Sequence, residues 1–123
     1  DVTQAGYREL GATTTSRING CVFCASVHAR HVANYLKNRP MAQRFLAEGI
    51  YTELPPVERA VVDVSAKLTN DPESLTSADL APLRELGFTD LQILDSLNYA
   101  AFFANANRLM LTLGEPVAQP KLR

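Results

Sequence analysis

The sequence predicts an all-α protein, and two observations lead to that prediction. Apolar residues recur at spacings of three and four in several segments, which is the period of a helix that buries one face. The chain lacks the sustained alternation of β-branched and aromatic residues with polar ones that is typical of a half-buried strand. Prolines, glycines and capping residues divide the chain into predicted helices over residues 5–14, 21–37, 41–48, 55–70, 76–87 and 90–113.

The first three helices are bounded by residues that break or cap helices. In the first helix, Gly11 and the threonines that follow it leave the C-terminal end open, because both residue types are weak helix formers. Asn19 and Gly20 interrupt the helical pattern, and either one is placed to cap the second, central helix. The third helix follows Pro40 and ends at Gly49, so its length is well defined.

The fourth and fifth helices have equally clear signals. Pro55 opens the fourth helix, whose apolar residues form a single stripe, and Pro72 follows its end. Thr76 and Asp79 form an acidic variant of the capping box at the start of the fifth helix, which finishes at Gly87. Both are therefore expected to be short amphipathic helices.

The last helix has the strongest start signal and the most apolar surface. Thr89 and Gln92 form a capping box, Phe88 and Ile93 occupy the positions of a hydrophobic staple, and Gly114 supplies the stop. Its apolar residues lie around most of the circumference: Leu91, Ile93, Leu94, Leu97, Tyr99, Phe102, Phe103, Ala106, Leu109, Met110 and Leu113. Because a small domain has little material to cover such a helix, we expect a homo-oligomer. The tail after Gly114 is expected to be an extended arm.

Length and composition limit the function classes. The 123 residues are 46% hydrophobic and 20% charged, which is typical of one globular domain spanning residues 1–123. A formal net charge of -1 provides no field to attract nucleic acid or anionic lipid. The apolar stretches are far shorter than the ~20 residues that cross a bilayer, so we expect no membrane partner. With only two cysteines and no signal segment in view, a cytoplasmic location is expected, although any leader before Asp1 cannot be read.

Four reactive side chains share one face of the second predicted helix: Cys21, Cys24, His28 and His31. A Cys₂His₂ zinc site has the right atoms, but one straight helix separates residues 21 and 31 by about 15 Å at ~1.5 Å per residue. Zinc through three of these residues and a remote ligand stays a lesser alternative, and we expect no metal and no cofactor. His31 is expected to be a surface histidine.

A redox role places fewer geometric demands on these residues than a metal site does. Thiols in the first turn of a helix have a lowered pKa, and a second cysteine three residues away can form a disulfide with the oxidised sulfur. Helix position alone does not decide between Cys21 and Cys24. His28 lies one turn beyond Cys24 and can exchange protons with it, whereas Cys21 is seven residues from His28, about 10 Å along the axis at ~1.5 Å per residue. This spacing favours Cys24 as the reactive thiol.

The spacing of Glu9, Cys21, Cys24 and His28 follows the pattern E-x11-C-x-x-C-x3-H. In this respect the chain resembles the AhpD-like alkylhydroperoxidases of the carboxymuconolactone decarboxylase superfamily. The segments at residues 16–21 and 105–109 are similar to those of the peroxidase-related branch. The resemblance implies an all-helical fold that assembles as trimers or hexamers. Decarboxylase members lack the cysteine pair, so both thiols argue against decarboxylase chemistry.

The resemblance also implies roles for the four residues. Cys24 would attack the peroxide, Cys21 would resolve the oxidised sulfur, and Glu9 and His28 would relay protons. Phe23 stands where the prototype has a histidine, which implies either a simpler relay or a weaker peroxidase activity. The implied function is a thiol peroxidase that reduces hydrogen peroxide or organic hydroperoxides at the expense of an unknown dithiol reductant. The alternative is a redox-sensing or structural helical module without peroxide turnover.

One further polar group lies on the last helix, and it could bond across an interface, line a pocket or face water: Asn98, Asn105, Asn107 and Arg108. Polar residues on a helix surface usually face water, so we assign these four no catalytic role.

Overall fold

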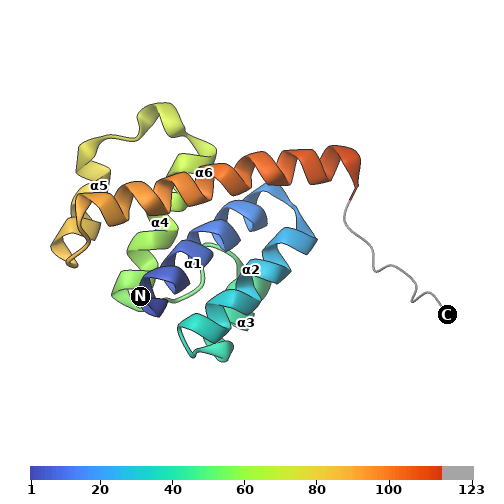
Figure 1. Ribbon diagram of the computed structural model, residues 1–123, viewed down its shortest axis with the longest axis horizontal. Helices are drawn as coiled ribbons and strands as arrows, with labels where there is room; N and C mark the ends of the chain where they lie inside the picture. The colour runs from blue at the N-terminus through green and yellow to red at the C-terminus, as the bar shows by residue number, and fades with distance from the viewer. Residues whose placement is uncertain (115–123) are drawn as a thin grey trace.

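The structure, a computed structural model, describes residues 1–114, and the predicted extended arm after Gly114 lies outside the described residues. Within that range the chain forms helices and no strand, which confirms the all-α prediction (Figure 1). The helices are α1 (Val2–Asn19), α2 (Val22–Tyr35), α3 (Arg39–Glu48), α4 (Pro56–Asn70), α5 (Ser77–Glu85) and α6 (Asp90–Leu113), with a 3₁₀ turn at Pro72–Ser74.

Helix α1 is surrounded by three other helices. It packs against α2, α4 and α6, while α3 packs against α2, and α5 packs against α4 and α6. Figure 1 shows α6 running along the length of the molecule, with α1 between it and the layer formed by α2 and α3. The core between these layers is apolar and includes Leu10, Val32, Met41, Phe45, Val61, Val62, Leu83 and Ile93.

Helix α1 is much longer than the predicted 5–14, and the surrounding helices explain why. The hydroxyls of Thr13 and Thr14 each donate to the carbonyl four residues back, at 2.8 Å, so these buried threonines continue the helix without unpaired polar groups. Gly11 allows α4 to approach closely, since a methyl group there would lie 3.0 Å from Ser65 Oγ. Tertiary packing therefore outweighs the weak helix propensity of this stretch.

The junction between α1 and α2 also differs from the prediction. Gly20 ends α1 in the left-handed conformation at φ 79°, and its N–H donates to the Arg17 carbonyl. Cys21 is the residue that caps α2, rather than Asn19 or Gly20, and it does so without a side-chain bond. The sequence signal at Gly20 thus belongs to the end of α1. At the other end, α2 stops at Tyr35, and Lys37 has a positive φ of 52°.

Helix starts elsewhere agree closely with the sequence signals. The Asn38 side chain accepts from Met41 N–H and starts α3 two residues before the predicted position. The capping boxes of α5 and α6 are both present as predicted. Helix α6 spans the predicted residues 90–113. Short-range capping is therefore the part of this fold that the sequence predicts best.

Helix α6 leaves much of its apolar surface uncovered within the described chain. Only Ile93, Ala100 and Asn107 are buried along its length. Its exposed large apolar side chains are Leu91, Leu94, Phe102, Leu109, Leu111 and Leu113. In the described part of the chain, no helix combines the length with the hydropathy needed to cross a bilayer.

A candidate redox site between three helices

The two cysteines form a disulfide at the start of α2. Their Cα atoms are 5.3 Å apart, and the two residues are 0% and 4% exposed for Cys21 and Cys24. Cys21 is the N-cap of the helix and Cys24 lies in its first turn, where the unpaired N–H groups of the helix end favour a thiolate once the disulfide is reduced. The structure therefore places the pair as predicted, in its oxidised form.

A carboxylate from α1 reaches the histidine on α2. His28 Nδ1 lies 2.5 Å from Glu9 Oε2, and both side chains are almost fully buried. The ring is held from the other side by Phe103, whose centroid is 4.1 Å away in an edge-on arrangement. Because Nδ1 faces the carboxylate, Nε2 is the nitrogen that can exchange a proton with another group.

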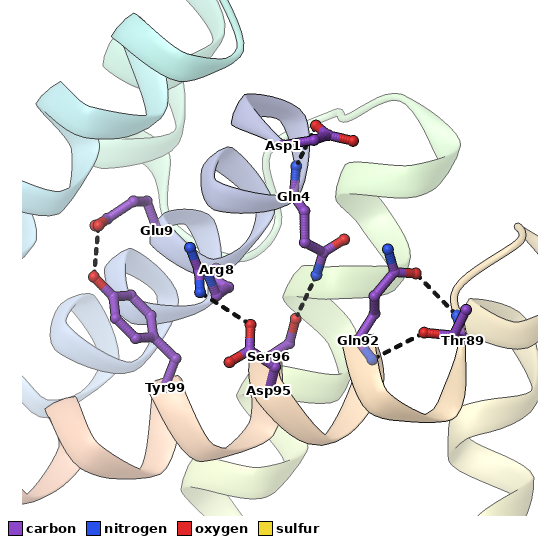
Figure 2. Close-up of polar contacts among 9 residues, drawn as sticks. All are labelled: Asp1, Gln4, Arg8, Glu9, Thr89, Gln92, Asp95, Ser96 and Tyr99. Atoms are coloured by element: carbon purple, nitrogen blue, oxygen red, sulfur yellow. Dashed lines mark hydrogen bonds and ion pairs between the residues drawn. The ribbon is translucent and has the colours of Figure 1, made fainter.

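Tyr99 of α6 completes the cluster around Glu9. Its hydroxyl donates to Glu9 Oε1 at 2.6 Å, as Figure 2 shows. Each oxygen of the carboxylate thus has its own partner. The sequence pattern predicts Tyr99 only as one of the apolar residues of the last helix and does not predict this contact. A signal existed, since a tyrosine that packs into an apolar environment needs a hydrogen-bond partner for its hydroxyl.

These contacts shift the ionisation of both partners. Burial alone would raise the pKa of Glu9, but the hydrogen bonds from His28 and Tyr99, together with the nearby charge of His28 and His31, lower it below its ordinary value. Burial, and after it the bond to the Glu9 carboxylate, raises the pKa of Tyr99. Glu9 is therefore a carboxylate, and Tyr99 a neutral hydroxyl donor, at neutral pH.

The cluster opens into a cavity of about 290 Å³. Its lining is mostly apolar and comes from α1, α2 and α6: Glu9, Phe23, Cys24, Val27, His28, His31, Tyr99, Phe103, Ala106 and Met110. The Met110 Sδ lies 3.3 Å from Cys24 Sγ, so a methionine sulfur covers the cysteine from the α6 side. A small molecule in this cavity would meet Cys24 and His28 together.

The structure brings three of the four predicted site residues onto this one cavity. Glu9, Cys24 and His28 all line it. Cys21 is joined to Cys24 by the disulfide but lines a different hollow, beside Arg17 and Leu46. The roles of these residues remain predictions, because the structure shows their positions and not their reactions.

Two other sequence expectations need correction. His31 is not a plain surface residue: it is half-buried, lines the cavity and lies 6.2 Å from the ring of Tyr35 in a stacked arrangement. Asn107, which was expected to face water, is 0% exposed and donates to Ser16 Oγ at 3.0 Å. The other members of that polar group, Asn98, Asn105 and Arg108, are exposed. Among residues 1–114, we find no group of three or more His, Cys, Asp or Glu side chains that could hold a metal ion.

The comparisons with known proteins point to one group of solved structures. No family model matches the chain, and no curated protein matches it significantly. An uncharacterized peroxidase-related protein from Ralstonia eutropha JMP134, described as an alkylhydroperoxidase AhpD core, is 32% identical with a TM-score of 0.78 over 87% of this chain and 56% of that one. An uncharacterized peroxidase-related protein from Silicibacter sp. TM1040 is 29% identical with a TM-score of 0.80 over 92% of this chain and 60% of that one. The chain thus spans less than two thirds of the length of either.

Proposed function

From the premise that the chain is AhpD-like, which its fold and its identity to these solved structures support, we propose that it is a thiol-dependent peroxidase. The observation that carries the proposal is the convergence of Cys24, His28 and Glu9 from two helices on one cavity. A thiol, a base and a carboxylate that orients the base are the groups that thiol peroxidase chemistry needs.

The first step is oxidation of Cys24. Its thiolate attacks the terminal oxygen of a hydroperoxide, the O–O bond breaks, and the leaving alkoxide or hydroxide takes a proton from the His28 imidazolium. The products are a sulfenic acid on Cys24 and an alcohol or water. Glu9 accepts the hydrogen bond from Nδ1 and stabilises the imidazolium before the transfer.

The second step forms the disulfide seen in the structure. The Cys21 sulfur attacks the Cys24 sulfenic sulfur, the S–O bond breaks, and the departing hydroxide leaves as water with the proton of the Cys21 thiol, which gives the Cys21–Cys24 bond. A dithiol reductant then attacks the disulfide, passes through a mixed disulfide, and leaves as its own cyclic disulfide with both cysteines reduced. Two electrons enter with each dithiol and leave with each peroxide, so the cycle balances.

Peroxide consumption tests the proposal. With excess dithiothreitol as the dithiol, the wild-type protein should consume many equivalents of hydrogen peroxide or cumene hydroperoxide above the reductant blank. Cys24→Ser should reduce consumption to the blank rate. Loss of a single equivalent of peroxide, with no continuing consumption when reductant is present, would contradict the proposal and support a redox-sensing or structural module.

Self-association is a second part of the proposal. The uncovered apolar face of α6 supports assembly of several copies, as trimers or hexamers, because five exposed leucines and one exposed phenylalanine on a single helix are costly in water. Light scattering after size exclusion should give a mass of three or six times 13.5 kDa for this chain. A monomer at micromolar concentration would contradict it. The cytoplasmic location, the single domain over residues 1–123 and the lack of a nucleic-acid partner stay predictions from the sequence.

A further inference from the structure

We propose that Tyr99 is a positioning residue of the redox site: its hydroxyl fixes the Glu9 carboxylate in the orientation that makes His28 present Nε2 toward Cys24. The role in peroxide reduction rests on the function proposed above, whereas the effect on the Cys24 thiol does not. Tyr99 comes from α6, so the inference adds a third helix to a site that the sequence pattern places on α1 and α2 alone.

The bonds around Glu9 restrict the carboxylate to one orientation. Tyr99 holds Oε1 at 2.6 Å and His28 holds Oε2 at 2.5 Å. If the carboxylate rotated about its terminal bond, both bonds would break, and the cost would be high for side chains this deeply buried. Without Tyr99, the Glu9 carboxylate would be held by His28 alone. It would then have no separate anchor from which to orient the His28 ring.

The ring of Tyr99 is itself held in place. It packs edge-on against Phe103 with centroids 4.9 Å apart, and the Arg8 guanidinium lies 5.7 Å from its centroid. Arg8 also pairs with Asp95 at 3.1 Å, one turn before Tyr99 on α6. Figure 2 shows the Arg8–Asp95 and Tyr99–Glu9 contacts side by side along the seam between α1 and α6. The hydroxyl therefore reaches Glu9 from a fixed ring rather than from a mobile one.

The seam contains a second link that keeps the two helices in register. Gln4 Nε2 lies 3.3 Å from Ser96 Oγ, one turn before the Arg8 contact on α1 (Figure 2). The Arg8–Asp95 pair is half exposed, so each of these links contributes little energy by itself. Together they set the rotation and height of α6 over α1, on which the position of the Tyr99 hydroxyl depends.

The charge on Glu9 depends on the groups that face it. On its own helix Arg8 lies over the Tyr99 ring, and the titratable groups from the helices packed against Glu9 are His28, His31 and Tyr99, with Tyr35 acting on Tyr99. Tyr99 lowers the pKa of Glu9 by donating to the charged form. Removing the hydroxyl should raise that pKa, so that Glu9 is protonated at a higher pH and supports the His28 imidazolium less well.

The test measures the reactivity of the Cys24 thiol rather than peroxide turnover. In the Cys21→Ser background, the rate of alkylation by iodoacetamide is followed from pH 4 to pH 9. Tyr99→Phe should slow alkylation about tenfold at pH 7 and move the acid limb of the profile up by about one pH unit. Tyr51→Phe is the matched control, because it removes the same hydroxyl from a side chain that is 91% exposed and lines no part of the cavity, and it should leave the profile unchanged.

A double-mutant comparison shows whether Tyr99 acts through Glu9. In a Glu9→Gln background, Tyr99→Phe should have almost no further effect on the profile. A full Tyr99→Phe effect in that background would overturn the proposal. So would a slower rate at every pH with an unmoved acid limb, which is what a structural role alone predicts, or an unchanged rate.

The remaining outcomes separate this proposal from the proposed function. A wild-type protein with the expected alkylation profiles that consumes no peroxide refutes the function only. A wild-type protein that consumes peroxide, but whose Tyr99→Phe profile matches the wild type, refutes the Tyr99 role only. If Tyr99→Phe did not fold, ultraviolet titration of the 4 tyrosines would decide, because Glu9→Gln should lower the pKa of the highest-titrating one. Identical titrations would overturn the proposal.

Discussion

Two buried polar clusters link α1 to α6, and they differ in charge and in surroundings. The first joins Glu9 to His28 and Tyr99 and opens into the cavity beside Cys24. The second lies two turns further along each helix, where Asn107 donates to Ser16 Oγ at 3.0 Å and accepts from the Asn19 amide at 3.2 Å. The first cluster contains ionisable groups, and the second consists of neutral amides and a hydroxyl.

The comparison shows that burial of polar groups does not by itself indicate function. Both clusters satisfy their hydrogen bonds, and among the described residues no buried side-chain nitrogen or oxygen is left without a partner. The Asn107 cluster can only hold helices together, because none of its groups gains or loses a proton near neutral pH. The Glu9 cluster can also transfer protons, because a molecule bound in the cavity can exchange a proton with His28.

The largest expected effect is on activity at the charged cluster. Glu9→Gln keeps the size of the side chain but removes the charge that supports the His28 imidazolium. We expect the rate of peroxide consumption to fall about a hundredfold, within the range that acid–base groups contribute. Glu48→Gln, at the exposed end of α3, makes the same chemical change away from the site and should leave the rate as it was. A Glu9→Gln rate within a factor of two of the wild type would remove the relay from the mechanism.

The next effect is on stability at the neutral cluster. Asn107→Leu keeps a side chain that branches at Cγ but leaves the Ser16 hydroxyl and the Asn19 amide without their partner, which should cost about 2 kcal/mol of unfolding free energy. Urea unfolding measures the loss. The peroxide rate per folded molecule should stay near the wild-type value. If Asn107→Leu lowered that rate as much as Glu9→Gln does, the division between the two clusters would be wrong.

The smallest effect is on the pH dependence of stability. The pKa of Glu9 is lower in the folded chain than its ordinary 4.5. The ionised carboxylate therefore makes its full contribution to folding stability above pH 4.5, and this contribution is lost as the pH falls through the folded pKa. The free energy of unfolding of the wild type should therefore exceed that of Glu9→Gln by about 1 kcal/mol at pH 7, and this difference should shrink below about pH 4.5. The Asn107→Leu deficit should not change over the same range. Urea unfolding at several pH values checks both, and a constant Glu9→Gln difference would contradict the assignment.

Capping residues made the helices predictable, while contacts between distant helices did not. The T-x-x-Q box at Thr89 predicted the start of α6 because capping depends on neighbours three residues away. The end of α1 was missed because buried Thr13 and Thr14 are stabilised by helices that come later in the chain. Local signals and tertiary packing agree in α6 and disagree in α1.

The site follows the same division. Cys21, Cys24 and His28 could be predicted from their spacing, since one helix places them on a common face. Glu9 was identified from a resemblance, and its contact with His28 depends on how α1 packs against α2. Tyr99 was missed because it is 90 residues from Glu9, and a single sequence gives no direct sign of contacts over such a separation. The buried Asn107 was missed for the same reason.

Trapping the first oxidation product shows directly whether Cys24 is the peroxide-reactive thiol that works with His28 and Glu9. Reduced Cys21→Ser and Cys24→Ser proteins are exposed briefly to one equivalent of peroxide and treated with dimedone, and the labelled residue is identified by mass spectrometry. We expect a sulfenic acid on Cys24 in the Cys21→Ser protein and no rapid label on Cys21 in the Cys24→Ser protein. A label on Cys21 that forms at the wild-type rate of oxidation would contradict it.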